Sequence, residues 1–145
     1  MKFLTRGLYD GSSQELTEDF DVVWRAACDA YAAHLEQLRP GLPPDLRAFA
    51  DTTLHDGVVR AVERPSPSEL VLTVDAARNP WGPTGVFRLH FTGVREFDGA
   101  TPDLVGDEWL YDEVHPHPAA AFEYRVLFWK HDFRVAADDL HVRQV

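Results

Sequence analysis

The stretch AFEYRVLFW, residues 121–129, alternates between apolar and polar side chains, and this alternation decides the fold class. Successive side chains of a β-strand point to opposite faces. One face of an extended strand would carry Phe122, Tyr124, Val126 and Phe128, and the other would carry Glu123, Arg125 and Leu127. The stretch therefore predicts a strand that is buried on one side.

The same period of two recurs from Val58 to the end of the chain. Further candidate strands are VVRAVE (58–63), ELVLTVD (69–75), VFRLHFTGV (86–94), WLYDEVH (109–115) and FRVAADDLHVRQ (133–144). The connections are short, and some are rich in Pro and Gly; residues 130–132 form a tight hairpin turn. Five or six strands joined in this way favour a mainly antiparallel sheet.

The first part of the chain is helical in pattern. Apolar residues recur every three or four positions from Gln14 to Leu38, and Ser12 with Glu15 has the spacing of a capping box. The prolines of RPGLPP (39–44) end this helix, and Pro44 can begin a short second one. We expect a single α+β domain over residues 1–145. Its mainly helical part (1–56) would supply N-terminal helices that pack on a five- or six-stranded sheet formed by the β-rich part (57–145).

Composition limits the classes of partner. The 145 residues include 45% hydrophobic ones, and the formal net charge is −10. Such a charge repels nucleic acids and anionic membranes and attracts a basic protein. Cys28 is the single cysteine, and no apolar run reaches the length of a signal peptide core or a membrane span. We therefore expect a cytoplasmic acidic protein without a cofactor, and oligomerisation is left open.

The stretch TTLHDGVV, residues 52–59, places His55 beside Asp56 where the helical pattern changes to the strand pattern. Asp56 and Gly57 suggest a turn in which Gly57 supplies a positive φ. His55 is then expected to pack on Trp or Tyr, or to bond a strand carbonyl. A catalytic pair of His55 and Asp56 is the alternative, and the structural role is favoured, because adjacent strand residues face opposite ways.

The other histidines allow a metal site as a further alternative. Glu113 and His115 are two residues apart, so they share one face of a strand, and His90 could join them if its strand is a neighbour. The chain has no H-E-x-x-H motif, and Pro116 interrupts its one H-x-H. We therefore predict no metal site, with His90, Glu113 and His115 as the candidate ligands if one exists.

Exposed aromatic residues are the remaining candidates for a binding site. Trp81 lies in a loop rich in Pro and Gly, and Trp109 and Tyr111 are expected on one face with Glu113. Aromatic anchors rimmed by acidic residues suit a basic protein partner. Trp24 and Trp129 are expected in the core.

Three stretches carry a resemblance to known families. The start MKFLTRGLY, the turn Leu54-His55-Asp56 and the strand pair WLYDEV (109–114) and FEYRVLF (122–128) resemble an uncharacterised bacterial family, a domain of unknown function. The region from Leu54 to about Val74 is also similar to immunity proteins of bacterial toxin systems. The second resemblance implies that the domain binds and neutralises a toxin.

These observations favour a non-enzymatic protein-binding module with an acidic surface, and an immunity-like role is its more specific form. One alternative is a small metal-dependent or acid–base enzyme that uses His55 and Asp56 together with His90 and His115. Another is a structural homo-oligomer that pairs through the free edge of its last strand, LHVRQV (140–145).

Overall fold

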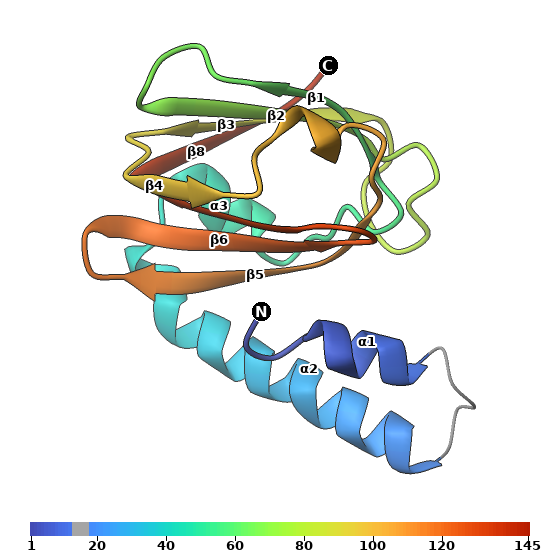
Figure 1. The fold of residues 1–145 in the computed structure, drawn as a ribbon. Helices are drawn as coiled ribbons and strands as arrows, with labels where there is room; N and C mark the ends of the chain where they lie inside the picture. The colour runs from blue at the N-terminus through green and yellow to red at the C-terminus, as the bar shows by residue number, and fades with distance from the viewer. Residues whose placement is uncertain (13–17) are drawn as a thin grey trace.

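The computed structural model describes residues 1–12 and 18–145, and its strands form two four-stranded antiparallel sheets that face each other (Figure 1). The first sheet has the order β1 (Val58–Glu63), β2 (Glu69–Asp75), β3 (Val86–Thr92), β8 (Asp139–Gln144). The second has the order β4 (Glu96–Asp98), β7 (Asp132–Ala137), β6 (Ala120–Phe128), β5 (Trp109–His117). The class is α+β, as expected.

The α-helices precede the sheets in sequence. They are α1 (Arg6–Ser12), α2 (Glu18–Leu38) and α3 (Pro44–Phe49), with 3-10 turns at Arg39–Gly41 and Pro102–Leu104. α1 and α2 lie below β5, on the side of the second sheet that faces away from the first (Figure 1). The predicted helical residues 14–17, and the cap expected between Ser12 and Glu15, lie outside the described residues. No helix in the described ranges is long and apolar enough to cross a membrane.

The hydrophobic core lies between the two sheets. Phe91 of β3 meets Tyr124 of β6 and Phe133 of β7, with ring centroids 5.9 Å and 6.4 Å apart. The prediction of one five- or six-stranded sheet with a core beneath the helices is therefore wrong in its detail. Each sheet has one apolar face, and the two sheets bury these faces against each other.

The predicted strand 133–144 is divided between the sheets. Ala137 pairs with Phe122 in the second sheet, whereas Asp139 pairs with Thr92 in the first. Asp138 lies between them, and its N–H donates to the carbonyl of Thr92 at 3.1 Å. Continuous alternation in sequence does not reveal this change of sheet, because both halves keep the period of two.

β8 is an edge strand of the first sheet, and α3 lies alongside it. The N–H of Val142 donates to the carboxylate of Asp45 in the first turn of α3, at 3.1 Å. Edge N–H groups are available for pairing with another chain unless something occupies them. This contact occupies one donor of the edge that the homo-oligomer hypothesis would use.

Candidate functional site

The corner that precedes β1 is a tight turn whose geometry depends on Asp56 and Gly57. Gly57 N–H donates to the carbonyl of Leu54 at 2.7 Å. Asp56 itself has a φ of 61°, so the prediction that Gly57 supplies the positive φ is wrong. Aspartate tolerates this left-handed conformation better than most residues. A Cβ on Gly57 would lie 2.6 Å from the carbonyl oxygen of Leu54 and 2.8 Å from Val74. The glycine is needed for space.

His55 is held between the second sheet and the loop that follows β2. Its Nδ1 donates to the carbonyl of Leu110 at 2.7 Å, and its Nε2 lies 3.4 Å from Oδ1 of Asp56. Its ring centroid lies 4.3 Å from that of Trp81 and 5.4 Å from that of Tyr111. The side chain thus both bonds a strand carbonyl and packs on aromatic rings. His55 and Asp56 approach each other because they lie in a turn and not in a strand.

The loop that carries Trp81 is fastened to the residues just before His55. Nδ2 of Asn79 donates to the carbonyls of Thr53, at 2.7 Å, and Pro83, at 3.1 Å, and Oδ1 accepts the N–H of Trp81 at 3.1 Å. Asn79 is buried, and a Cβ on Gly82 would lie 2.6 Å from the carbonyl oxygen of Thr53. The indole is therefore held in one place although it is 69% exposed.

Trp81 belongs to a larger group of aromatic side chains around His55. We call this group the aromatic surface; its members are Tyr9, Trp24, Trp81, Tyr111 and Trp129. Tyr111 lies at its centre, with ring centroids 4.9 Å from Trp24 and 6.1 Å from Tyr9. Tyr9 also packs edge-on against Trp129 at 5.9 Å. The surface thus joins α1, α2, β5 and two connections.

Carboxylates surround the aromatic surface. The pKa of Tyr9 is raised by burial and then by the negative charges of Asp56, Asp10 and Glu108. Burial also raises the pKa of Tyr111 to about 12, with further contributions from Tyr9, Cys28 and Asp56. Asp56 and Glu108 are both partly exposed. A cation placed on these rings would therefore meet negative charge at the rim.

A small hollow opens beside His55. Its volume is about 190 Å³, and its lining includes Leu4, Tyr31, Thr53, His55, Trp81, Tyr111 and Asp112. Burial raises the pKa of Asp112 to about 7, although Nε1 of Trp109 donates to this carboxylate at 2.9 Å. The hydroxyl of Tyr124, which is also near Asp112, is buried and has no well-formed hydrogen bond to any of the described residues. Asp112 is thus a buried ionisable group whose polar neighbours are the indole N–H of Trp109 and the hydroxyl of Tyr124.

Glu113 lies on the outer face of β5 and binds the N-terminal segment. Its carboxylate accepts the N–H groups of Lys2, Phe3 and Leu4 at 2.9, 2.8 and 2.6 Å. Nε2 of His115 lies 2.7 Å from the same carboxylate. Burial raises the pKa of Glu113, but the hydrogen bonds outweigh burial and lower it to about 2. This buried carboxylate is an anchor for the segment and is not exposed to a partner.

Two residues expected on the binding surface lie inside the protein. Trp109 and Glu113 are both fully buried, and only Tyr111 of the three β5 candidates reaches the aromatic surface. Trp109 and Tyr111 do not share a face, because a bulge lies between them: they pair with Phe128 and Leu127, which are adjacent in β6. Trp109 therefore points into the core, whereas Tyr111 and Glu113 point outward.

The candidate metal ligands do not converge. His90 lies on β3 of the first sheet and contacts Glu69 at 2.6 Å, whereas Glu113 and His115 lie on β5 of the second sheet. Within residues 1–12 and 18–145, no group of three or more His, Cys, Asp or Glu side chains is arranged to hold a metal ion.

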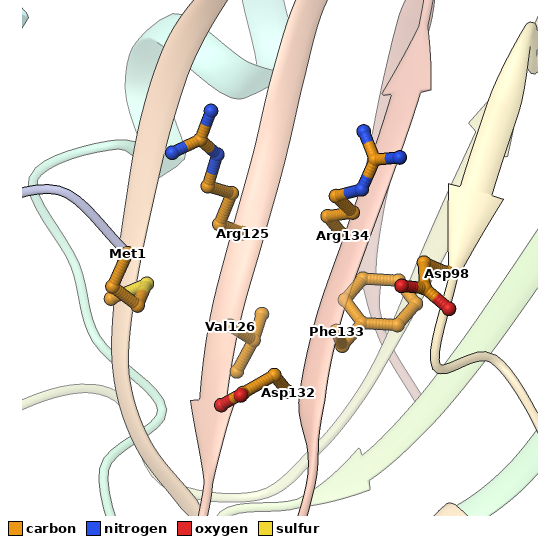
Figure 2. A pocket seen from close by; sticks show the side chains of 7 residues that line it. All are labelled: Met1, Asp98, Arg125, Val126, Asp132, Phe133 and Arg134. Carbon is orange, nitrogen blue, oxygen red and sulfur yellow. The ribbon is translucent and has the colours of Figure 1, made fainter. Parts of the chain in front are cut away.

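A further hollow, of about 170 Å³, lies on the second sheet near Met1 (Figure 2). Arg125 of β6 and Arg134 of β7 lie side by side at one end of it (Figure 2). Both arginines are paired, because the two oxygens of Glu123 accept from Arg125 at 2.7 Å and from Arg134 at 2.8 Å, and Arg134 also donates to Glu96 at 3.3 Å. We therefore do not assign a ligand to this hollow.

Sequence reasoning missed three members of the aromatic surface. Trp24 is predicted to lie in the core but is half-buried, and it packs against Tyr111. Trp129 was expected in the core but is 53% exposed, because it falls in the turn after β6. Tyr9 was not singled out. The run Phe128-Trp129-Lys130-His131 places Trp129 just before a polar turn, and this position is the one signal that indicated exposure.

The chain belongs to a family of proteins of unknown function, DUF4085, whose model matches residues 4–136. This match confirms the resemblance to an uncharacterised family. None of the curated proteins compared with the chain matches it.

Proposed function

We propose that this protein is a non-enzymatic binding module that recognises a basic segment of another protein through the aromatic surface. The observation that carries the proposal is Trp81, which is 69% exposed and yet held in place by its contacts with Asn79 and His55. An anchor that is already ordered loses little conformational entropy when it is buried by a partner. Tryptophan and tyrosine dominate the binding energy of many protein interfaces.

The charges around the surface support a basic partner. Asp56 and Glu108 flank the aromatic rings, and the chain as a whole carries a net charge of −10. A lysine or arginine would gain from stacking on an exposed indole and from the carboxylates at its rim. The overall charge would also accelerate the encounter with a positively charged protein.

The immunity-like role is the more specific form of this proposal. The Leu54-His55-Asp56 stretch carries the resemblance to immunity proteins, and His55 packs against Trp81 and Tyr111 of the aromatic surface. A toxin would then be the partner bound there.

The acid–base enzyme is the alternative that has some geometric support. His55 and Asp56 are 3.4 Å apart and a hollow lies beside them. However, both ring nitrogens of His55 face oxygen atoms of the protein itself, and His90 lies on the other sheet. The contacts of His55 favour a role in holding Trp81 over a role in proton transfer.

The test is to capture a partner from the native host with immobilised protein and then to measure its affinity for purified variants by calorimetry. Trp81→Ala and Trp129→Ala should each weaken binding by tenfold or more, as expected for a hot spot of about 2 kcal/mol. Phe97→Ala is the control, because Phe97 is an exposed aromatic residue on β4, at the far end of the sheets from the loop of Trp81 (Figure 1).

If all three variants bind the partner with equal affinity, the aromatic surface is not part of the interface. An acidic partner, or the absence of any captured protein, would contradict the proposal as a whole.

A further inference from the structure

A group of basic side chains lines a hollow on the outer face of the first sheet. The hollow has a volume of about 230 Å³ and is lined by Arg88, His90, His141 and Arg143. They belong to β3 and β8 and alternate with Leu89, Phe91, Leu140 and Val142, which face or pack against the core. This face is turned away from α1 and α2 (Figure 1).

The four side chains are paired with like partners across the two strands. Arg88 lies directly opposite Arg143, and His90 lies directly opposite His141, with the imidazole centroids 6.3 Å apart. Like charges that face each other on adjacent strands destabilise a sheet. Two facing arginines on a strongly acidic protein therefore lower the stability of the sheet, so their placement needs an explanation other than stability.

The second sheet contains a matched comparison. Arg125 and Arg134 also lie directly opposite each other, and they lie side by side in Figure 2. There, Glu123 accepts hydrogen bonds from both guanidinium groups, and this bridging carboxylate reduces their repulsion. The pair of Arg88 and Arg143 has no such bridging carboxylate among the described residues.

The carboxylates near the hollow contact its four basic side chains unequally. Oε2 of Glu63 is 3.5 Å from Arg88, whereas Arg143 is exposed and has no ion pair within residues 1–12 and 18–145. The carboxylates nearest His141, those of Asp139 and Asp45, lie 3.6 Å and 4.0 Å from its ring nitrogens. These separations exceed those of hydrogen bonds.

Among the described residues, Glu69 is the carboxylate in closest contact with the four side chains, because it accepts from Nε2 of His90 at 2.6 Å. Its pKa is lowered by the hydrogen bond from His90 and then by that from Ser66. Glu69 therefore holds His90 in place, and within the described residues it makes no ion pair with Arg88 or Arg143.

We propose that this hollow binds a phosphate group, either as inorganic phosphate or as a small phosphate monoester. Guanidinium groups bind phosphate oxygens in a bidentate manner, and two of them on opposite sides would balance a dianion. The imidazole N–H of His141 supplies a further donor, whereas Nε2–H of His90 already donates to Glu69. A metal cation does not suit the site, because Arg88 and Arg143 flank both imidazoles. The proposal is independent of the aromatic surface.

The experiment is a titration of ¹⁵N-labelled protein, followed by two-dimensional NMR at constant ionic strength. Inorganic phosphate, phosphoserine and serine are the three arms. We expect saturable shifts confined to residues 86–92 and 139–144 with at least one phosphate compound. Tighter binding of phosphoserine would identify a monoester as the ligand, whereas equal or weaker binding would identify free phosphate. Serine should have no effect.

Arg143→Gln and Arg88→Gln should each weaken phosphate binding by about tenfold, the loss of one charge-assisted contact. Arg60→Gln is the matched control, because Arg60 is an exposed arginine of the same sheet that is paired with Asp75 at 2.8 Å and lies outside the hollow. It should change the affinity less than twofold. Because Arg143 is exposed and has no ion pair among the described residues, its variant should unfold at the same or a higher urea concentration than the wild type.

Three results would overturn the proposal. The first is the absence of saturable shifts with either phosphate compound. The second is an equal loss of affinity in all three variants, which would indicate general electrostatic attraction. The third is saturable binding of Zn²⁺ at His90 and His141 with no response to phosphate.

Discussion

The indole of Trp81 packs against the imidazole of His55, with ring centroids 4.3 Å apart and an interplanar angle of 37°, although the β1–β2 hairpin separates the two residues in sequence. The same imidazole donates to the carbonyl of Leu110 on β5. His55 therefore connects three segments: the corner before β1, the loop after β2 and the second sheet. The buried side chain of His55 thus holds the exposed indole of Trp81 in a fixed position.

Replacing His55 with alanine should lower the free energy of unfolding by about 2 kcal/mol, since it removes a buried hydrogen bond and the packing under Trp81. Urea denaturation measures the loss. His141→Ala is the control, because His141 is an exposed histidine, and its effect should stay within about 0.5 kcal/mol. If both variants are equally stable, His55 does not fasten the corner.

The corner itself makes opposite predictions for two adjacent positions. Gly57→Ala should destabilise the protein by about 2 kcal/mol or more, because the new Cβ would lie 2.6 Å from the backbone oxygen of Leu54. Asp56→Gly should be neutral or stabilising by up to about 1 kcal/mol, because glycine adopts the φ of 61° without strain. Thermal unfolding followed by circular dichroism compares the two. Equal destabilisation would mean that the Asp56 side chain matters more than its backbone.

Glu113 should make stability sensitive to acid. Its pKa is about 2 in the folded protein and near 4.5 when unfolded, so its contribution is complete above pH 4.5 and is lost as the pH falls toward 2. Glu113→Gln should lower the free energy of unfolding at pH 7 by roughly 3 kcal/mol. Urea denaturation at several pH values should show this difference shrink in acid. A difference that does not change with pH would assign the loss to packing.

Asp112 should make stability depend on pH in the opposite direction. Its folded pKa of about 7 lies above the ordinary value of 3.8, so the wild type loses stability from this group as the pH rises from about 4 to 7. Asp112→Asn keeps an acceptor for Nε1 of Trp109 but never ionises. The variant should match the wild type near pH 4 and exceed it at pH 8 by on the order of 2–4 kcal/mol. Loss of stability at both pH values would refute the argument.

Much of the local structure could be predicted from the sequence. The strand character of 121–129, the end of the long helix before Pro40 and the start of a helix at Pro44 all follow from periodicity and from proline chemistry. His55 was singled out for its position at the corner, and its aromatic contacts match the expectation.

The composition of the site was less predictable. Of the β5 candidates, Trp109 and Glu113 are buried, because a bulge turns one toward the core and the N-terminal segment covers the other. Neither the bulge nor the covering segment can be recognised from apolar–polar alternation in the sequence. A bulge shifts the alternation by one residue without changing its period. Trp129 reaches the surface only because the hairpin turn begins there.

The sequence by itself determined the α+β class, the places where strands and helices form and the turn before β1, because these depend on side chains that are near in the chain. Only the tertiary structure decided that the strands divide into two sheets at Asp138, that Arg88 faces Arg143 and that Trp81 rests on His55. Those relationships join residues far apart in sequence. Periodicity reports which face of its own strand a side chain occupies, but not which strand lies opposite.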